Sequence, residues 1–358
     1  MTDYIVHKNK NTVLGDNPEI TVILPVYGRS PYLDVTLASI QGNTYKKYEL
    51  VIVADCLDKE RENTIKSHNP DVFINAHNRL GLSKSRNLAA EYARGKILFF
   101  TDDDIKLPQD CFEKIHTLFK DNSIHCLIGV YSLRDGDTNL CTLYKNSWIR
   151  FSYLKSPKEV SWFFTAVGAI KKEDWIASAH FQAEYNRKIG GEDIEFGLRL
   201  SQNGKHIMFE KKLEVTHLRN YSFYDLLYND LCRAYGYTLI GCASRKNFLH
   251  VLKSGIGNIS HDFIASSVLA GLFVVCLCFA CLNSEIIWET VGILIIYFIL
   301  NISFYHYIRK NFSLMAALKC MPLMMLDHFV CCCGVTAAVF KKLVSAVTSK
   351  IFLKHGQQ

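Results

Sequence analysis

The sequence predicts an α/β domain followed by a group of membrane helices, and two observations carry this prediction. Up to about residue 260, short apolar runs rich in β-branched residues alternate with amphipathic stretches. This pattern is typical of a parallel sheet with helices on both faces. Beyond that point the chain contains apolar stretches of about 20 residues, which is the length that a helix needs to cross a bilayer.

Composition and charge narrow the class of protein. The 358 residues are 49% hydrophobic and 21% charged, which excludes a disordered or collagen-like chain. The net charge of +7 suits an anionic membrane face. The sequence has no dense Lys/Arg patch with interleaved aromatics, so nucleic acid is not expected as a partner. Seven of the 13 cysteines lie in or beside apolar stretches, which favours free thiols in a reducing compartment. The polar first 20 residues do not predict a cleaved signal peptide.

The soluble part divides into alternating strands and helices. Buried parallel strands are predicted where short apolar runs are bounded by polar or turn residues, at 20–25, 49–54, 72–76 and 97–101. A helix is predicted at 31–42 from its apolar face and its terminal Gly42. A second helix is predicted at 83–94, with Ser83 as its cap and Gly95 at its end.

Three of these strands end in residues that suggest a binding site. Ligands of such sheets bind beyond the carboxyl ends of the strands. The first strand ends at Pro25-Val26-Tyr27, the second at Asp55, and the fourth at Asp102-Asp103-Asp104. Three adjacent carboxylates repel one another, and a divalent cation such as Mg²⁺ or Mn²⁺ relieves that repulsion. A solvated acidic turn is the alternative interpretation of the triplet.

These motifs together resemble the family-2 glycosyltransferases of the GT-A fold. The resemblance rests on TVILPVYGR, the strand end at Asp55, NRLGLSKSRN, FFTDDDI and GGEDIEFGLRL, which occur in the family's order and spacing. It covers roughly residues 20–220. It implies a Rossmann-like mixed α/β sheet with helices on both faces and a nucleotide-sugar as substrate.

The resemblance assigns the donor site. The residues that match the family's nucleotide-sugar and diphosphate positions are Pro25, Val26, Tyr27, Arg29, Asp55, Gly81, Arg86, Asp102 and Asp103. Around Asp55 the sequence departs from the family, because Ala54 and Cys56-Leu57 replace its usual residues. A UDP-sugar is the expected donor. For Arg86, a surface ion pair is the alternative to a phosphate contact.

The resemblance also assigns metal and acceptor residues. It implies Mn²⁺ or Mg²⁺ held by Asp104, with Asp102 next and His217 completing the shell; the alternative for His217 is a structural histidine. In Gly190-Gly191-Glu192-Asp193 it makes Asp193 the general base, with Gly191 and Glu192 at the acceptor. The alternative is ordinary helix-capping acids. Trp162 lies where the family builds its acceptor wall, and core packing is the alternative for its ring.

The apolar C-terminal part predicts a helical hairpin in a membrane. The first two stretches cover about 263–282 and 286–308. Lys and Arg flank the pair on both outer sides and are missing from the turn, so both flanks and the large N-terminal domain are expected on the cytoplasmic side. The resemblance implies that the membrane is the inner (plasma) membrane. A third stretch at about 320–340, containing Asp327 and His328 as a possible mutual polar pair, favours an embedded or interfacial segment, with a full span as the alternative.

The predicted organisation and function follow. The expected parts are an N-terminal extension (1–19), the GT-A domain (20–220), amphipathic interfacial helices (221–260), the membrane region (261–340) and a basic cytoplasmic tail (341–358). The chain is expected to transfer one sugar, with inversion, to a lipid-linked or surface-polysaccharide acceptor. The alternatives are a polyprenyl-phosphate sugar synthase and a processive polysaccharide synthase, whose QxxRW motif this sequence does not contain. From a different class, a non-catalytic sugar-nucleotide-binding scaffold is the alternative.

Overall fold

The computed structural model of the protein describes residues 4–9, 17–28, 30–133, 139–185 and 191–355. The chain divides into two compact units, which are described separately. Unit 1 comprises residues 1–136, 153–187 and 192–219. Unit 2 comprises residues 137–152, 188–191 and 220–358.

Unit 1 is built on a mixed β-sheet. Its strands are β1 (Tyr4–Lys8), β2 (Ile20–Tyr27), β3 (Tyr48–Asp55), β4 (Val72–Ala76), β5 (Ile97–Thr101), β6 (Ile105–Lys106), β7 (Cys126–Tyr131), β8 (Glu159–Val160), β9 (Val167–Lys171) and β10 (Ile207–His217). Their order is β1-β4-β3-β2-β5-β9-β7-β10-β6, with β8 paired to β10. Strands β2 to β5 are mutually parallel, whereas β9 runs antiparallel between β5 and β7. The predicted mixed α/β sheet is thus confirmed.

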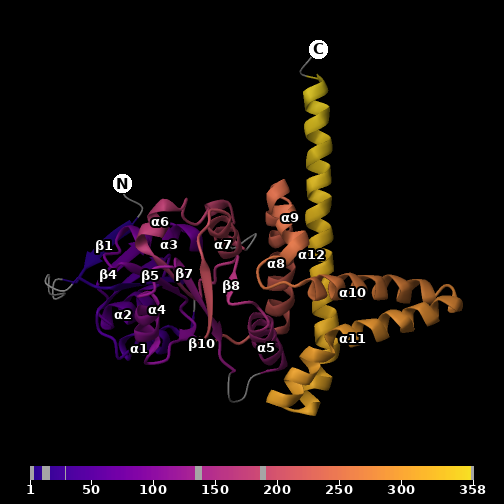
Figure 1. The fold of residues 1–358 in the computed structure, drawn as a ribbon, viewed down its shortest axis with the longest axis horizontal. Helices are drawn as coiled ribbons and strands as arrows, with labels where there is room; N and C mark the ends of the chain where they lie inside the picture. Colours follow the sequence, from indigo (N-terminus) through magenta and orange to yellow (C-terminus); the bar gives the residue numbers. More distant parts are fainter. Residues whose placement is uncertain (1–3, 10–16, 29, 134–138, 186–190, 356–358) are drawn as a thin grey trace. The chain divides into compact units, whose positions relative to one another are not determined.

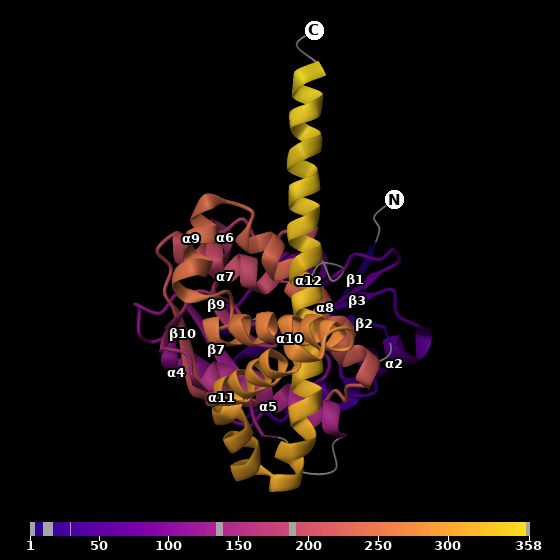
Figure 2. The same ribbon diagram turned by 90° about the vertical axis from the view of Figure 1, so that its right-hand side faces the viewer.

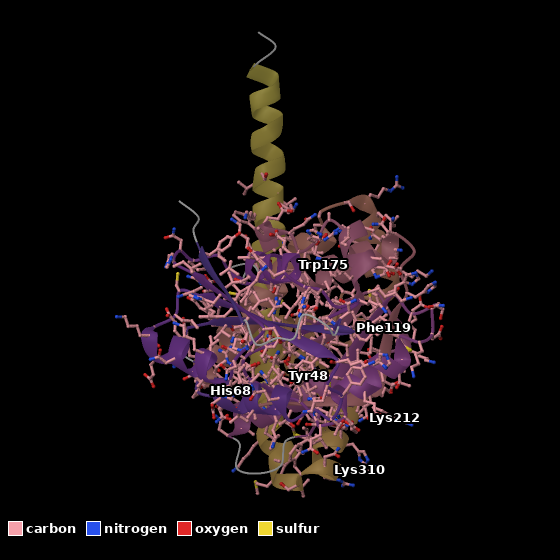
Figure 3. All side chains as sticks on the ribbon, turned by 90° about the vertical axis from the view of Figure 1, so that its left-hand side faces the viewer. Tyr48, His68, Phe119, Trp175, Lys212 and Lys310 are labelled. Carbon is pink, nitrogen blue, oxygen red and sulfur yellow. The ribbon has the colours of Figure 1, made fainter. Side chains whose placement is uncertain are left out.

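Helices cover both faces of this sheet. They are α1 (Leu33–Gln41), α2 (Lys59–Ser67), α3 (Leu82–Glu91), α4 (Cys111–Leu118), α6 (Lys172–Ala177), the 3₁₀ turn η1 (Ala183–Tyr185) and α7 (Glu192–Gln202). In Figure 1, α1, α2 and α4 lie on one side of the strands and α3, α6 and α7 on the other. Figure 3 labels Tyr48 and Trp175 on these opposite sides. Tyr48 packs against Phe112 of α4, and Trp175 packs against Phe100 and Phe196.

The four strands and the first helix predicted from the sequence are confirmed, but the ends of α3 differ from the prediction. Gly81, not Ser83, is the cap residue, and its φ of +84° makes the turn into the helix. Ser83 lies inside the helix and is buried. The helix ends at Glu91, before Gly95. A Cβ at Gly95 would lie 2.6 Å from the backbone nitrogen of Thr21, so this glycine allows close packing on β2.

Unit 2 is helical. Its helices are α5 (Leu140–Leu154, the last two residues of which belong to unit 1), α8 (Phe223–Gly241), α9 (Arg245–Ser254), α10 (His261–Ala280), the 3₁₀ turn η2 (Ser284–Ile286), α11 (Ile287–Asn311) and α12 (Leu314–His355). α12 packs against α8, α10 and α11, and Figure 2 shows it in yellow beside them. Within the described part of the chain, three helical segments are long and apolar enough to cross a membrane: 261–280, 284–311 and 314–345. The third contains Pro322 and continues as one helix into the basic stretch.

Asp327 and His328 of α12 are buried, but they do not pair with each other as the sequence suggested. The Asp327 carboxylate accepts a hydrogen bond of 2.7 Å from the Tyr144 hydroxyl of α5. His328 Nδ1 lies 2.9 Å from the Tyr297 hydroxyl of α11. Adjacent positions on a helix point in different directions, so the two side chains meet different neighbouring helices.

A buried ion pair joins α5 to α8. Lys145 Nζ lies 2.6 Å from both carboxylate oxygens of Asp230, and both side chains are almost fully buried. Arg233 Nη1 adds a third contact to Asp230 at 3.2 Å. Burial alone would raise the pKa of Asp230, but Lys145 and Arg233 lower it on balance. Asp230 is therefore ionised at neutral pH.

Candidate functional site

The candidate site lies at the carboxyl ends of the parallel strands. Parallel pairing of β2 with β3 brings Tyr27 opposite Asp55, and parallel pairing of β2 with β5 brings the Asp102–Asp104 segment to the same edge. The single rim that the sequence predicted is therefore present.

Of the predicted donor residues in the first strand, only Tyr27 reaches this rim with an accessible side chain. Pro25 and Val26 are buried, and Val26 is paired with Ala54 of β3. The guanidinium of Arg79 lies 4.7 Å from the centroid of the Tyr27 ring, a distance typical of a cation–π contact. Arg29 lies outside the described residues.

Asp55 binds the loop that leads into α3. Its two carboxylate oxygens accept hydrogen bonds from the backbone N–H groups of Leu80, at 2.7 Å, and Gly81, at 2.8 Å. The side chain is buried. Charge-assisted bonds of this kind are among the stronger hydrogen bonds in proteins, so Asp55 fixes the loop that the family resemblance places over the diphosphate.

The three adjacent aspartates occupy different environments. Asp102 forms an ion pair with Arg86, with 2.8 Å between Oδ1 and Nη2. Burial and the charges of its two neighbours raise the pKa of Asp103 well above its ordinary value, although the backbone N–H of Tyr27 donates to it. The charged form of Asp103 is thus disfavoured relative to that of an exposed aspartate. The repulsion expected within the triplet is relieved partly in this way.

Asp104 and His217 face each other across a short strand pair. Antiparallel pairing of β6 with β10 sets His217 opposite Ile105, and His217 Nε2 lies 3.6 Å from Asp104 Oδ2. Burial alone would raise the pKa of Asp104, but hydrogen bonding to His217 and its charge lower it on balance. The His217 ring stacks on Tyr131 with 4.5 Å between centroids and 6° between planes, which fixes its orientation.

Arg86 joins the two acidic motifs. While Nη2 contacts Asp102, Nη1 donates a hydrogen bond of 3.0 Å to Glu192 Oε1 at the start of α7. The Arg86 side chain is only 2% exposed, so it is not the surface ion pair considered above. Burial alone would lower its pKa, but Asp102 and Glu192 raise it on balance.

The GGED motif leads into the N-terminus of α7, which begins at Glu192. Gly191 has a φ of +93°, and a Cβ there would lie 2.8 Å from Ile240 within unit 2. Gly190 lies outside the described residues. Asp193 is partly exposed. Its Oδ1 accepts a hydrogen bond of 2.8 Å from the backbone N–H of Ile194, and its backbone carbonyl accepts one of 3.3 Å from the backbone N–H of Phe163.

Trp162 is mostly buried beside this helix. It is 7% exposed and packs edge-on against Tyr153 with 6.1 Å between centroids. Its indole Nε1 is buried and has no hydrogen-bond partner among the described residues. The ring therefore packs in the core of the described structure, which is the alternative that the sequence left open, while Nε1 remains a donor to be satisfied.

The residues present fit a divalent cation in part. No group of three or more His, Cys, Asp or Glu side chains among the described residues is arranged to hold a metal ion. Asp104 and His217 supply a carboxylate and an imidazole close together. Mn²⁺ accepts both ligand types, whereas Mg²⁺ strongly prefers oxygen. Such a pair fits a cation whose remaining ligands come from a bound diphosphate.

Two contributors to the site were not identified from the sequence. The sequence motif NRLGLSKSRN contains Arg79 but indicates no contact for it, and no sequence motif points to Tyr131. Both act through aromatic stacking on a predicted residue. An arginine in the glycine-containing loop was a usable signal for the first, whereas only the sheet order reveals the second.

Comparisons with known proteins agree with this geometry. Residues 21–182 match the family described as Glycosyl transferase family 2. A glycosyltransferase of Methanocaldococcus jannaschii is 26% identical over 197 residues, covering 52% of this chain and 66% of that protein. The teichuronic acid biosynthesis glycosyltransferase TuaG of Bacillus subtilis is 29% identical, covering 34% of this chain and 49% of TuaG. This chain thus spans less than two thirds of either relative.

A solved structure shows the same fold. The mannosyltransferase PcManGT from Pyrobaculum calidifontis, determined with GDP-Man and Mn²⁺, superposes with a TM-score of 0.53 at 16% identity, covering 89% of this chain and 87% of that one. At that identity the likeness establishes the GT-A-like fold alone. Fold, motif order and family match agree: residues 21–182 match glycosyl transferase family 2, the fold is GT-A-like, and the C-terminal part of the chain carries long apolar helices.

Proposed function

We propose that the protein transfers a single sugar from a nucleotide-sugar to a hydroxyl of a lipid-linked or surface-polysaccharide acceptor by an inverting, metal-assisted displacement. The observation that carries this proposal is the link through Arg86, which brings the acid at the end of β5 and the acid at the start of α7 to one guanidinium. Donor-side and acceptor-side motifs that lie far apart in the sequence therefore border the same site.

Asp193 is proposed as the general base. It lies next to Glu192 at the N-terminus of α7, where the helix dipole favours an ionised carboxylate. It is partly exposed, so an acceptor hydroxyl can approach it. Removing the hydroxyl proton as the oxygen attacks the anomeric carbon is the role that an inverting transfer requires of one carboxylate. Gly191 and Glu192 are proposed to orient the acceptor.

Asp104 and His217 are proposed to hold Mn²⁺, or Mg²⁺ in its place, with the diphosphate of the donor. A bound cation would neutralise charge on the departing nucleotide diphosphate. Tyr27 and Arg79 are proposed to contact the nucleotide, and the loop fixed by Asp55 is proposed to border the diphosphate. A UDP-sugar remains the proposed donor, while the GDP-Man bound to PcManGT makes GDP-sugars the first comparison.

The acceptor proposal draws on the apolar helices and on relatives. A Campylobacter jejuni relative, 25% identical over 95 residues and matched over 31% of its length, is a glucosyltransferase named for an undecaprenol-linked glycan. Helix α9 exposes Phe248, Leu249 and Leu252 and carries Arg245 and Lys253 without an acidic residue. An amphipathic basic helix of this kind binds at anionic membrane surfaces. We therefore propose an acceptor that is reached from the membrane surface, on the cytoplasmic side.

The test is donor hydrolysis and transfer by the full chain in lipid with UDP-, GDP- and dTDP-sugars and Mn²⁺. Asp193→Asn should abolish transfer and leave Mn²⁺-dependent nucleotide binding intact. Glu195→Gln is the matched control, because Glu195 lies on the same helix and pairs with Arg199 instead; it should retain activity. Failure of the wild type to bind any of these nucleotides would overturn the proposal.

A further inference from the structure

Arg86 is placed where it contacts protein carboxylates and not solvent. Its Nη1 and Nη2 are each within 3.0 Å of a carboxylate oxygen from Glu192 and Asp102, and its side chain is 2% exposed. Its Nε is buried without a partner among the described residues, and Phe181 lies 5.9 Å from its central carbon. Each terminal nitrogen therefore already donates one of its two N–H groups to a protein carboxylate.

Asp102 and Glu192 belong to different elements. Among the described residues, Arg86 is the side chain that hydrogen-bonds to both of them. Asp102 follows β5, 16 residues from Arg86, and Glu192 opens α7, 106 residues away. A guanidinium is planar and rigid and presents its donors in a fixed fork, whereas a lysine ammonium is a single point on a flexible stem. The arginine therefore sets both the distance and the angle between these two acids, which a lysine would not do.

We propose that Arg86 is a positioning residue for transfer, which fixes the start of α7, and with it Asp193, relative to the strand end that carries Asp102 and Asp104. This inference rests on the proposed function. It departs from the phosphate contact that the family resemblance suggested for this residue. In this arrangement Asp102 Oδ1 is bound to Arg86. Asp104 is then the residue of the aspartate triplet that is first available to bind the cation.

The two roles predict different kinetics. A positioning residue acts on the geometry of attack, and a misplacement of about 1 Å costs on the order of 10²-fold in rate. Arg86→Lys should therefore lower kcat about 10²-fold, while KM for the donor and the Kd of nucleotide with Mn²⁺, measured by calorimetry, stay within about threefold. A phosphate contact would instead weaken nucleotide binding and raise KM.

The matched control is another arginine–glutamate pair on α7. Arg199 contacts Glu195 through Nε at 2.8 Å and Nη2 at 3.1 Å, with a further bond to the carbonyl of His180. Arg199→Lys removes a similar pair of guanidinium–carboxylate contacts near the C-terminal end of α7, whereas Glu192 lies at its N-terminal end. It should lower stability without the selective loss of kcat.

A double-mutant cycle tests the bridge itself. Glu192→Gln leaves the Arg86–Asp102 pair in place, and it takes the place of Arg86→Lys if the latter does not fold. It should also lower kcat with nucleotide Kd unchanged. The two substitutions together should cost little more than either alone, because both break one link. Additive losses in kcat would overturn the inference.

The outcomes separate the inference from the proposed function. If the wild type transfers a sugar but Arg86→Lys weakens nucleotide binding and keeps its kcat, Arg86 is a phosphate ligand and the inference alone is wrong. If the wild type transfers no sugar from any donor, the proposed function fails and takes the inference with it. A selective loss of kcat in Arg86→Lys, absent from Arg199→Lys, supports both.

Discussion

Gly197 sets how closely α7 approaches the segment that carries Trp162. A Cβ at this position would overlap the backbone nitrogen of Phe163 and the backbone of Trp162. These are main-chain atoms, and the backbone N–H of Phe163 also donates a hydrogen bond to the carbonyl of Asp193. The segment therefore cannot move away as the end of a flexible side chain would. Gly197→Ala should therefore push the helix that carries Glu192 and Asp193 away from its support.

The expected change in the free energy of unfolding of Gly197→Ala follows from two opposing effects. Replacing glycine by alanine inside a helix stabilises a protein by about 1 kcal/mol. Overpacking in a close-packed interior costs about 1–3 kcal/mol, and the upper end applies because backbone must move. The expected net destabilisation of Gly197→Ala is about 2 kcal/mol. Displacement of Asp193, the proposed base, by a fraction of an ångström should lower kcat about tenfold or more.

Urea unfolding of the full chain in detergent, followed by tryptophan fluorescence, measures the first effect, and donor turnover measures the second. Gly292→Ala is the control, because Gly292 is also helical and a Cβ there meets nothing within 4 Å. That variant should be neutral or slightly stabilised. A Gly197→Ala protein as stable and as active as the wild type would refute the packing argument.

Further predictions follow from the buried groups. Lys145→Met should lower stability by about 3–5 kcal/mol in thermal unfolding, because it leaves a buried carboxylate without its main partner. Since the pKa of Asp230 is depressed in the folded state, its contribution is present above its unfolded pKa and is lost as the pH falls through the folded value. The loss of stability in Lys145→Met should therefore be largest near neutral pH and should shrink as the pH falls. Burial raises the pKa of the Cys111 thiol, so alkylation at pH 8 followed by mass spectrometry should modify it only after denaturation. Tyr131→Leu removes the ring on which His217 stacks and should raise the Mn²⁺ concentration for half-maximal nucleotide binding about tenfold.

The strands and the rim of the site could be predicted because their causes are local. Each parallel strand is a short apolar run, and its last residues necessarily reach one edge of the sheet. The positions of Asp55, Asp102 and Asp104 follow from that rule alone. The end of α3 was misjudged for a related reason, since Gly95 looks like a helix terminator but serves a tertiary contact with β2.

The contacts within the site could not be predicted, because they join distant parts of the chain. The residues around Arg86 do not indicate that its guanidinium contacts Glu192, 106 residues later in the sequence. Likewise, three consecutive aspartates look equivalent in sequence, whereas burial raises the pKa of the middle one and separate partners contact the outer two. The stacking of His217 on Tyr131 depends on β7 lying next to β10.

The length of α12 has a consequence for how much of it a bilayer can hold. Its 42 residues extend over about 63 Å at 1.5 Å per residue, while the hydrocarbon layer is about 30 Å thick. Even with a strong tilt, roughly a third or more of the rod must stand in headgroups or water. A helix that leaves the hydrocarbon without a break would carry its remaining turns into the headgroups or water as one continuous element.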